Sequence, residues 1–310
     1  MEPVPVRTFS LRKMFTGTGF FPFIVRRLLT AVLLILGITF IAFSVTQLVP
    51  GDPVAANLGQ SAYSDPEIVA AFEKEFGLDQ PVPIQYITYL GKLVQGDLGV
   101  SLSSKRPVAE DLREYFPATL EIAMFAVFVA LVLGILLGTI SAMTRDRLPD
   151  QIIRVFSLTG VSMPVFWTAI TAFYIFFFLL GWAPGTGRLE PGAEPPPTVT
   201  GLFTIDALLN GDLSTSKEAL SYLLLPALVL AVYALGVITR FTRASVLEIL
   251  GNDYVRTARS KGLSEFTVIR RHVLRPALLS IITIAGVAFA SLLAGSVLVE
   301  NVFSWPGLGQ

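Results

Sequence analysis

NDYVRTARSKGLSEFTVIRRHVLRP, residues 252–276, is a charged segment that lies between two long apolar runs. Asp253 can act as the N-cap of a short helix that begins at Tyr254. Gly262 interrupts this helix, and Ser264 then offers a second N-cap ahead of an apolar stripe. The pattern predicts two short helices joined at a glycine elbow, with arginines on the outside.

Two interpretations of this segment remain open on its residues alone. A basic amphipathic helix can lie on the surface of a membrane, with its cations among the lipid head groups. Alternatively, the small residues Ala258 and Gly262 allow a partner protein to approach closely, while the neighbouring basic residues orient that partner.

The composition places the chain among membrane proteins. Of its 310 residues, 53% are hydrophobic and 15% are charged, and the mean hydropathy is +0.67. Soluble domains carry about a quarter charged residues. Five runs lack charge for at least the roughly 20 residues that cross a bilayer core. We expect each to be a spanning helix, because backbone polar groups in lipid must be satisfied within the segment: Leu28–Gly51, Ile122–Arg145 less its ends, Val155–Gly187, Ala219–Thr239 and Pro276–Val299.

The loops between these runs alternate in charge. Residues 1–27 carry five basic and one acidic side chain, 142–154 carry three and two, and 240–275 carry eight and three. Two other loops are acidic. Residues 47–117 carry ten acidic and five basic side chains, and residues 181–219 carry five acidic and two basic side chains. Because cytoplasmic loops are enriched in Lys and Arg, the N-terminus is expected in the cytoplasm.

These features divide the chain into segments of different character. Between the first two spans we expect an extracytoplasmic subdomain with short helices at Pro66–Phe76, Ile84–Leu93 and Val108–Tyr115. The expected order is a cytoplasmic tail (1–27), a first spanning helix (28–49), the extracytoplasmic subdomain (50–116), a core domain with spans two to five (117–299) that includes a cytoplasmic loop (241–275), and an extracytoplasmic end (300–310).

Prolines and glycines mark positions inside the spans. Pro117 fits the first turn of the second span, and Glu121 then lies where the helix dipole favours an anion. Gly134 and Gly138 have the G-x-x-x-G spacing that lets another helix approach closely. Pro226 predicts a kink in the fourth span.

Two groups of residues are candidates for a translocation path. Ser162, Met163 and Pro164 divide the third apolar run and predict a kink that faces the bundle interior. Gly286 and Ala290 give the fifth span a face of small residues, which suits either close packing or the lining of a path.

Several functional classes find little support in the residues. The chain has no cysteine, so it has no disulfide framework and no thiolate chemistry. It has no G-x-x-x-x-G-K-[S/T] nucleotide loop. Its single histidine, His272, has no evident metal or nucleophile partner for an intramembrane enzyme. A passive channel remains an alternative from another class.

The segment Arg256-Thr257-Ala258, followed three residues later by Gly262, resembles the EAA loop of ABC-importer permeases. Asp253 to Ala258 is similar to the version found in the dipeptide and oligopeptide (DppB/OppB) branch. The resemblance extends in order along nearly the whole chain, through Leu48–Pro53, Gly96–Gly99, Phe116–Leu120, Ser162–Pro164, Leu225–Ala227 and Glu300–Gly309.

The resemblance implies an all-α polytopic membrane protein with the type I ABC importer permease fold, in which five spans are present here and a sixth is missing. It implies several partners: a homologous second permease, two cytoplasmic ATPases that bind ATP and Mg, an extracytoplasmic solute-binding protein and a peptide substrate. The implied location is a bacterial cytoplasmic (inner) membrane. The resemblance implies no nucleic acid partner, and no cofactor, metal or catalytic residue in this chain. Nickel and glutathione importers share these landmarks and are alternatives. The residues implied to dock an ATPase are Asp253, Tyr254, Arg256, Thr257, Ala258, Lys261 and Gly262.

Overall fold

The structure is a computed structural model that describes residues 20–48, 80–101 and 104–310. Within these ranges the regular structure is helical, apart from one isolated bridge between Val100 and Pro107. The chain forms two compact units, Met1–Val108 and Ala109–Gln310, which are considered separately below. The predicted helix Pro66–Phe76, and most of the landmark Leu48–Pro53, lie outside the described residues.

The first unit contains a long apolar helix and a short one. Helix α2 runs from Phe20 to Leu48, so it begins before the predicted run and includes the two arginines that were expected to precede it. Helix α5, Val82–Val94, confirms the predicted short helix. Tyr86 joins the two, because its hydroxyl donates to the carbonyl of Leu36 at 3.0 Å.

The second unit begins with α6, Val108–Met143, which is one continuous helix with Pro117 inside it. The prediction that a separate helix ends at Tyr115 and a new one begins at Pro117 is therefore wrong. Glu110 and Asp111 occupy the first turn, where the helix dipole favours acids. Pro117 packs against the loop glycine Gly201, where an added Cβ would lie 2.7 Å from the proline ring.

The third apolar run is broken as the sequence predicts. Helix α7, Leu148–Ser162, is followed by α8, Val165–Phe173, and a π-helical segment η1, Tyr174–Leu179, and the pair is bent by 102°. Met163 is extended (φ −76°, ψ 131°) because a residue before proline is driven out of the helical region. The helix begins at Leu148 rather than at the predicted Val155.

The loop after η1 contains α9, Phe203–Leu209, and leads into α10, Leu213–Leu250. Asp212 caps α10 by accepting from the amides of Ser214 and Thr215. Pro226 lies inside this helix. The helix continues past the predicted end of the fourth span, so residues 241–250 belong to it and not to a loop.

The charged segment folds as α11, Asp253–Ser260, and α12, Glu265–Thr267, which continues through the π-helical η2, Val268–Leu274, into α13, Arg275–Gly295. The second predicted short helix is thus the start of the fifth span. The predicted end of that span at Val299 is also wrong, because α13 ends at Gly295 and a separate helix, α14, runs from Val297 to Phe303.

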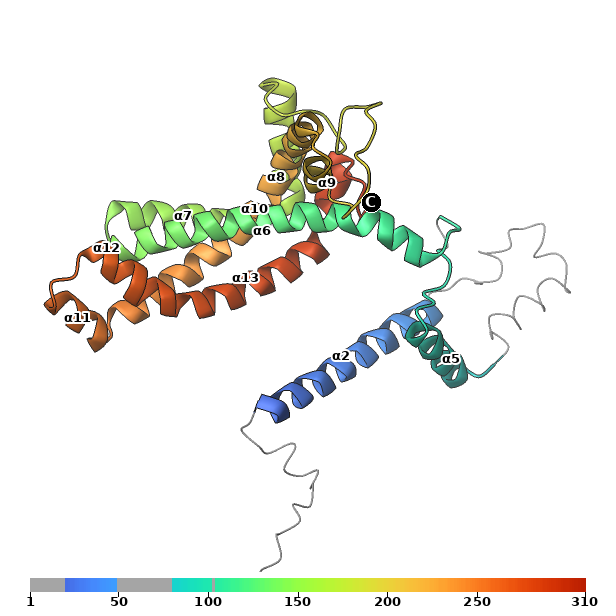
Figure 1. Cartoon of the computed structure of the whole chain (residues 1–310), viewed down its shortest axis with the longest axis horizontal. Coiled ribbons are helices and arrows are strands. Elements are labelled where there is room, and N and C mark those ends of the chain that lie inside the picture. The colour runs from blue at the N-terminus through green and yellow to red at the C-terminus, as the bar shows by residue number, and fades with distance from the viewer. Residues whose placement is uncertain (1–19, 49–79, 102–103) are drawn as a thin grey trace, which may run out of the picture. The chain divides into compact units, whose positions relative to one another are not determined.

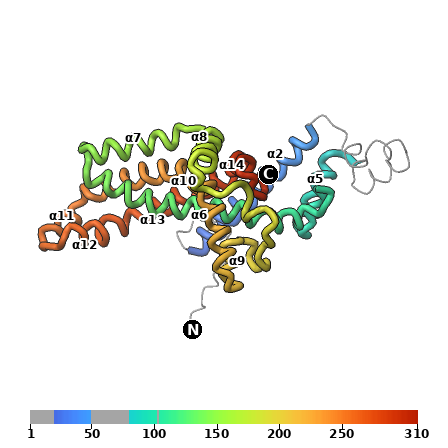
Figure 2. Tube along the Cα trace, turned by 90° about the horizontal axis from the view of Figure 1, so that it is seen from above, coloured from blue at the N-terminus to red at the C-terminus, as the bar shows by residue number. Residues whose placement is uncertain are grey.

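The long helices of the second unit run side by side. Figure 1 and Figure 2 show α6, α7, α10 and α13 along one direction, with α11 and α12 at one end and α8, α9 and α14 at the other. We call these the α11 end and the α9 end. In the described residues four helical stretches are long and apolar enough to cross a membrane, and a fifth is added if the bent pair counts as one span: Phe20–Leu48, Val108–Met143, Leu213–Leu250 and Glu265–Gly295, with α7 and α8 through η1 as the bent pair.

Candidate functional site

Helix α11 presents a polar outer face at one end of the bundle. Most of the residues predicted to dock an ATPase are exposed on it or directly after it: Asp253, Tyr254, Arg256, Thr257, Lys261 and Gly262. Tyr254 is 46% exposed although it is a large aromatic residue. Exposed aromatic and arginine side chains are the types that contribute most at protein interfaces. We call this surface the outer face of α11.

Ala258 lies on the opposite side of the same helix. It is 5% exposed and belongs with Val255 to the hydrophobic core that also contains Val268 and Val273 of η2. Its small side chain therefore allows α11 to pack closely within this chain. Ala258 therefore faces the chain's own core and not the outer face of α11, and its predicted part in the close approach of a partner stays a prediction.

The elbow after α11 has the predicted chemistry. Gly262 has a φ of +77°, a left-handed conformation that glycine adopts without the cost of a Cβ. Ser264 accepts from the amide of Thr267 and so caps α12 as predicted. Arg259 adds a contact across the elbow, because its Nε and Nη2 donate to the two carboxylate oxygens of Glu265 at 3.1 and 2.6 Å.

The connection from the elbow to the membrane is direct. No loop separates α12 from η2 and α13, which together form the 31-residue stretch Glu265–Gly295. On its other side α11 follows α10 after only Gly251 and Asn252. Helix α11 also packs against η2, and α13 packs against α10, so the outer face of α11 lies close to the start of one apolar helix and the end of another.

Glycines bring the long helices close together. An added Cβ on Gly138 of α6 would lie 2.6 Å from Thr242 Cβ and 2.7 Å from the carbonyl oxygen of Thr239. Gly134 similarly faces Ile238 at 2.7 Å. The predicted close approach at this G-x-x-x-G spacing is confirmed, and the neighbouring helix is α10.

A buried ion pair that the sequence analysis did not predict joins α7 to α10. Asp150 is fully buried, and Arg243 donates to both its carboxylate oxygens at 2.8 Å. The Ser141 hydroxyl at the end of α6 and the amide of Asp146 also donate to this carboxylate. All four hydrogen bonds end on one side chain, so Asp150 fixes three helices to one another near the α11 end.

Polar residues are also buried at the α9 end, around Glu121. Its carboxylate accepts from Arg188 at 2.6 Å and from the amide and hydroxyl of Thr204 at 2.9 and 2.6 Å. Arg188 also lies 3.5 Å from the ring centroid of Phe203. The predicted role of Glu121 at a helix start is wrong, because α6 begins earlier. Glu121 instead anchors the loop that carries α9.

A second buried carboxylate, Glu300 of α14, holds the end of the described chain. Thr119 and Ser296 donate their hydroxyls to it at 2.8 Å, and the amide of Gly309 donates at 2.7 Å. Trp305 donates its indole N–H to the carbonyl of Ala118 at 2.9 Å. These bonds attach residues 304–310 to the start of the apolar part of α6.

Asp206 of α9 organises the same loop. Its carboxylate accepts from the hydroxyl and amide of Thr200 and from the amides of Val199 and Gly201. Burial alone would raise the pKa of Asp206, but these hydrogen bonds outweigh it and hold the pKa below its ordinary value. The loop therefore depends on an ionised Asp206.

The residues predicted to line a path lie on open surfaces of this chain. Ser162 and Pro164 are exposed and Met163 is half-buried, at the bend between α7 and α8. Gly286 and Ala290 are exposed on α13, and an added Cβ on Gly286 would meet no atom within 4 Å. The two groups lie on different helices that both pack against α10.

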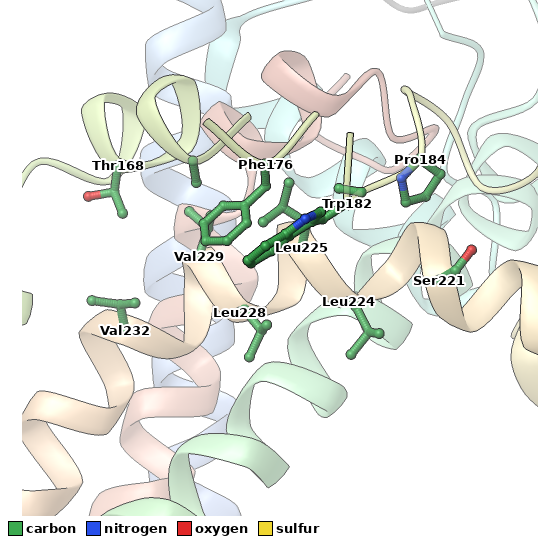
Figure 3. A pocket seen from close by; sticks show the side chains of 12 residues that line it. Thr168, Phe176, Trp182, Pro184, Ser221, Leu224, Leu225, Leu228, Val229 and Val232 are labelled. Atoms are coloured by element: carbon green, nitrogen blue, oxygen red, sulfur yellow. The ribbon is translucent and has the colours of Figure 1, made fainter. Parts of the chain in front are cut away.

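A cavity of about 450 Å³ lies between α8, η1 and α10 (Figure 3). Figure 3 shows the ring of Trp182 lying between Phe176 and the leucines of α10. Among the described residues its lining is mainly apolar, with the hydroxyls of Thr168 and Ser221 and the indole N–H of Trp182 as polar groups and no charged side chain.

The sequence matches two known protein families. Residues 134–310 match the family described as binding-protein-dependent transport system inner membrane component, and residues 20–123 match the N-terminal part of such membrane components.

Named relatives agree with this match. The chain is 44% identical over 278 residues to the probable D,D-dipeptide transport system permease protein DdpB of Escherichia coli K12, covering 90% of this chain and 81% of the relative. It is 42% identical over 288 residues to the di/tripeptide transport system permease protein DppB of Pseudomonas aeruginosa, covering 93% and 85%. It is 39% identical over 290 residues to the dipeptide transport system permease protein DppB of Escherichia coli K12, with the same coverage. The chain is therefore a multi-pass membrane permease with the type I fold, and it belongs to the binding-protein-dependent transport system inner membrane component family.

Proposed function

We propose that this chain is the permease subunit of an ATP-driven ABC importer for di- or oligopeptides. The family match supports the role of permease, and the three relatives above are named for the transport of dipeptides or of di- and tripeptides. In this proposal the chain carries no catalytic residue and no cofactor. ATP and Mg are bound by two ATPase partners, and a homologous permease and a solute-binding protein complete the importer.

The outer face of α11 is the proposed docking surface for one ATPase. The observation that carries this proposal is the division of α11 into a buried side, Val255 and Ala258, and an exposed side with Tyr254, Arg256 and Thr257. A helix lying on lipid would direct an apolar side outward. Here the apolar side faces the chain's own core, and the polar side remains free for a protein partner.

Movement of the docked helix is the proposed source of gating. Closure of the ATPases on ATP would displace α11, and α10 and α13 would move with it between an inward-open and an outward-open arrangement. The open surfaces at Ser162, Met163 and Pro164 and at Gly286 and Ala290 would face the path that this chain forms with its partner permease.

The α11 end is proposed to lie in the cytoplasm. The basic segments 142–154 and 240–275 meet at this end of the bundle, as Figure 1 shows for α11, α12 and the start of α7. Cytoplasmic loops carry the excess of Lys and Arg. The N-terminus would then be cytoplasmic in a bacterial inner membrane.

Docking is tested by substitutions on the outer face. The chain is co-expressed with its companion subunits, and ATPase co-purification and peptide uptake into proteoliposomes are measured for Tyr254→Ala and Arg256→Glu. Each should lower uptake at least tenfold at unchanged membrane insertion. Arg147→Glu is the matched control, since it makes the same charge change at an exposed residue that directly precedes α7 and is not part of α11. Normal co-purification and uptake in both variants would refute docking at this surface.

Substrate class requires a separate test, because the described residues that line the cavity between α8, η1 and α10 include no charged side chain that would select a solute. The co-purifying binding protein should prefer di- and oligopeptides to Ni²⁺ and to glutathione. Preference for the metal or for glutathione would replace the peptide assignment. Solute flux without ATP and without the binding protein would instead indicate a passive channel.

A further inference from the structure

A basic groove lies between α7 and α10 near the α11 end, apart from the outer face of α11. It encloses about 640 Å³. Its lining combines guanidinium groups with apolar side chains: Gln151, Arg154, Val155, Leu158, Arg240 and Arg243.

Close packing fixes the register of the two helices along this groove. An added Cβ on Gly236 would lie 2.5 Å from the carbonyl oxygen of Ser157, which brings the backbones together at that point. Asp150, which lies about two helical turns before Ser157 and so nearer the α11 end, binds Arg243. Since the helices run antiparallel between these two contacts, Arg154 and Arg240 lie on either side of the groove between them.

The two arginines between these contacts have no acidic partner. Asp150 already neutralises Arg243, whereas within residues 20–48, 80–101 and 104–310 no salt bridge reaches Arg154 or Arg240. Both are exposed. Two like charges facing one cavity repel each other, so an anion placed between them is stabilised by both.

The wall of the groove that leads away from the α11 end is apolar. Val155 and Leu158 are 63% and 57% exposed. On a spanning helix, exposed apolar side chains of this kind pack against hydrocarbon or against another helix. The groove thus presents cations at the end of a span and an apolar surface immediately deeper in the membrane.

We propose that this groove binds an anionic glycerophospholipid of the leaflet at the α11 end. Arg154 and Arg240 donate to the phosphate oxygens, for which the guanidinium fork is well suited, and Gln151 adds a neutral hydrogen-bonding group. Val155 and Leu158 lie along the first part of an acyl chain. A soluble acidic partner would match the cations but would leave the apolar wall uncovered.

The proposal is tested on the purified full-length chain by native mass spectrometry during titration with phosphatidylglycerol. Phosphatidylcholine supplies a neutral head group, and glycerophosphoglycerol supplies the anionic head group without acyl chains. Phosphatidylglycerol should be retained, and the other two should not. Each arginine near anionic lipid contributes about 1 kcal/mol. The double variant Arg154→Gln/Arg240→Gln should therefore weaken the apparent affinity for phosphatidylglycerol about 30-fold, equivalent to about 2 kcal/mol.

Two further variants keep the test independent of folding. Arg154→Lys/Arg240→Lys retains both charges and should bind phosphatidylglycerol within a few-fold of the unmodified chain. Arg145→Gln removes one charge at the same end but outside the groove, and should leave binding unchanged. Equal retention of phosphatidylcholine, retention of the free head group, or full binding by the glutamine double variant would each overturn the proposal.

One part of this inference rests on the proposed function, namely the side of the membrane on which the α11 end, and with it the groove, lies. Lipid binding is measured without ATPases, binding protein or peptide. A failure here would leave the transport proposal unaffected, and a failure of ATPase docking would leave the lipid site unaffected.

Discussion

The ion pair between Asp150 and Arg243 gives a quantitative prediction. Removing Arg243 leaves a fully buried carboxylate without its cation, and loss of one partner from a buried pair costs about 3–5 kcal/mol. The lower end applies, because two of the four hydrogen bonds to Asp150, from Ser141 and the Asp146 amide, remain in place. We expect Arg243→Ala to cost about 3 kcal/mol.

The reverse substitution should cost about as much. In Asp150→Ala the remaining arginine is 21% exposed at the side chain and can turn its guanidinium toward water or lipid head groups. About 3 kcal/mol is still expected, because all four hydrogen bonds to Asp150 are lost and the Ser141 hydroxyl and the Asp146 amide are left without their acceptor. The double variant should be more stable than the sum of the single losses predicts.

The measurement is thermal unfolding of the detergent-purified chain at one fixed scan rate. At about 2 °C per kcal/mol, Arg243→Ala and Asp150→Ala should each lower the unfolding temperature by about 6 °C. Arg145→Ala is the control, because its ion pair with Asp146 is exposed and should contribute less than about 1 kcal/mol. A loss of less than about 2 °C in either single variant, or strict additivity in the double variant, would refute the reasoning.

Three more outcomes follow from the structure. Gly138→Val should lower the unfolding temperature by several degrees, because the added Cβ would lie 2.7 Å from a backbone oxygen of α10. Gly286→Val is the control and should leave the unfolding temperature unchanged, because no atom lies within 4 Å of its added Cβ. Gly262→Val, forced to a φ of +77° at a cost of about 1–2 kcal/mol, should reduce peptide uptake at normal insertion, while Gly251→Ala at a φ of −75° should transport normally. Asp206 contributes stability above its unfolded pKa of about 3.9 that is lost as pH falls through its lower folded pKa. Unfolding temperatures between about pH 6 and pH 3 should therefore fall less steeply in Asp206→Asn than in the unmodified chain.

Features set by local chemistry could be predicted from the sequence. Gly262 forms the left-handed elbow, Ser264 caps α12, and Pro164 separates α7 from α8, because each outcome depends on the residue and its immediate neighbours. The close approach of α6 to α10 at Gly134 and Gly138 was predictable as a contact, although its partner helix was not.

Features that depend on distant residues could not be predicted in this way. Arg243 meets Asp150 from 93 positions away, and Thr119 meets Glu300 from 181 positions away. Helix α6 continues through Pro117 because the surrounding structure outweighs the local preference for a break there. The presence of Glu121 and Glu300 beside apolar runs was the available signal, since ionisable residues in such positions are seldom left without partners.

In the proposed gating, the continuous stretch from Glu265 to Gly295 would act as a lever arm. Its 31 residues have a length of about 45 Å at 1.5 Å per residue. A tilt of about 10° about one end therefore displaces the other by about 8 Å, which is close to the spacing between packed helices. Under the proposed gating, a small angular change at the α11 end would therefore be amplified into a displacement of about one helix spacing at the α9 end.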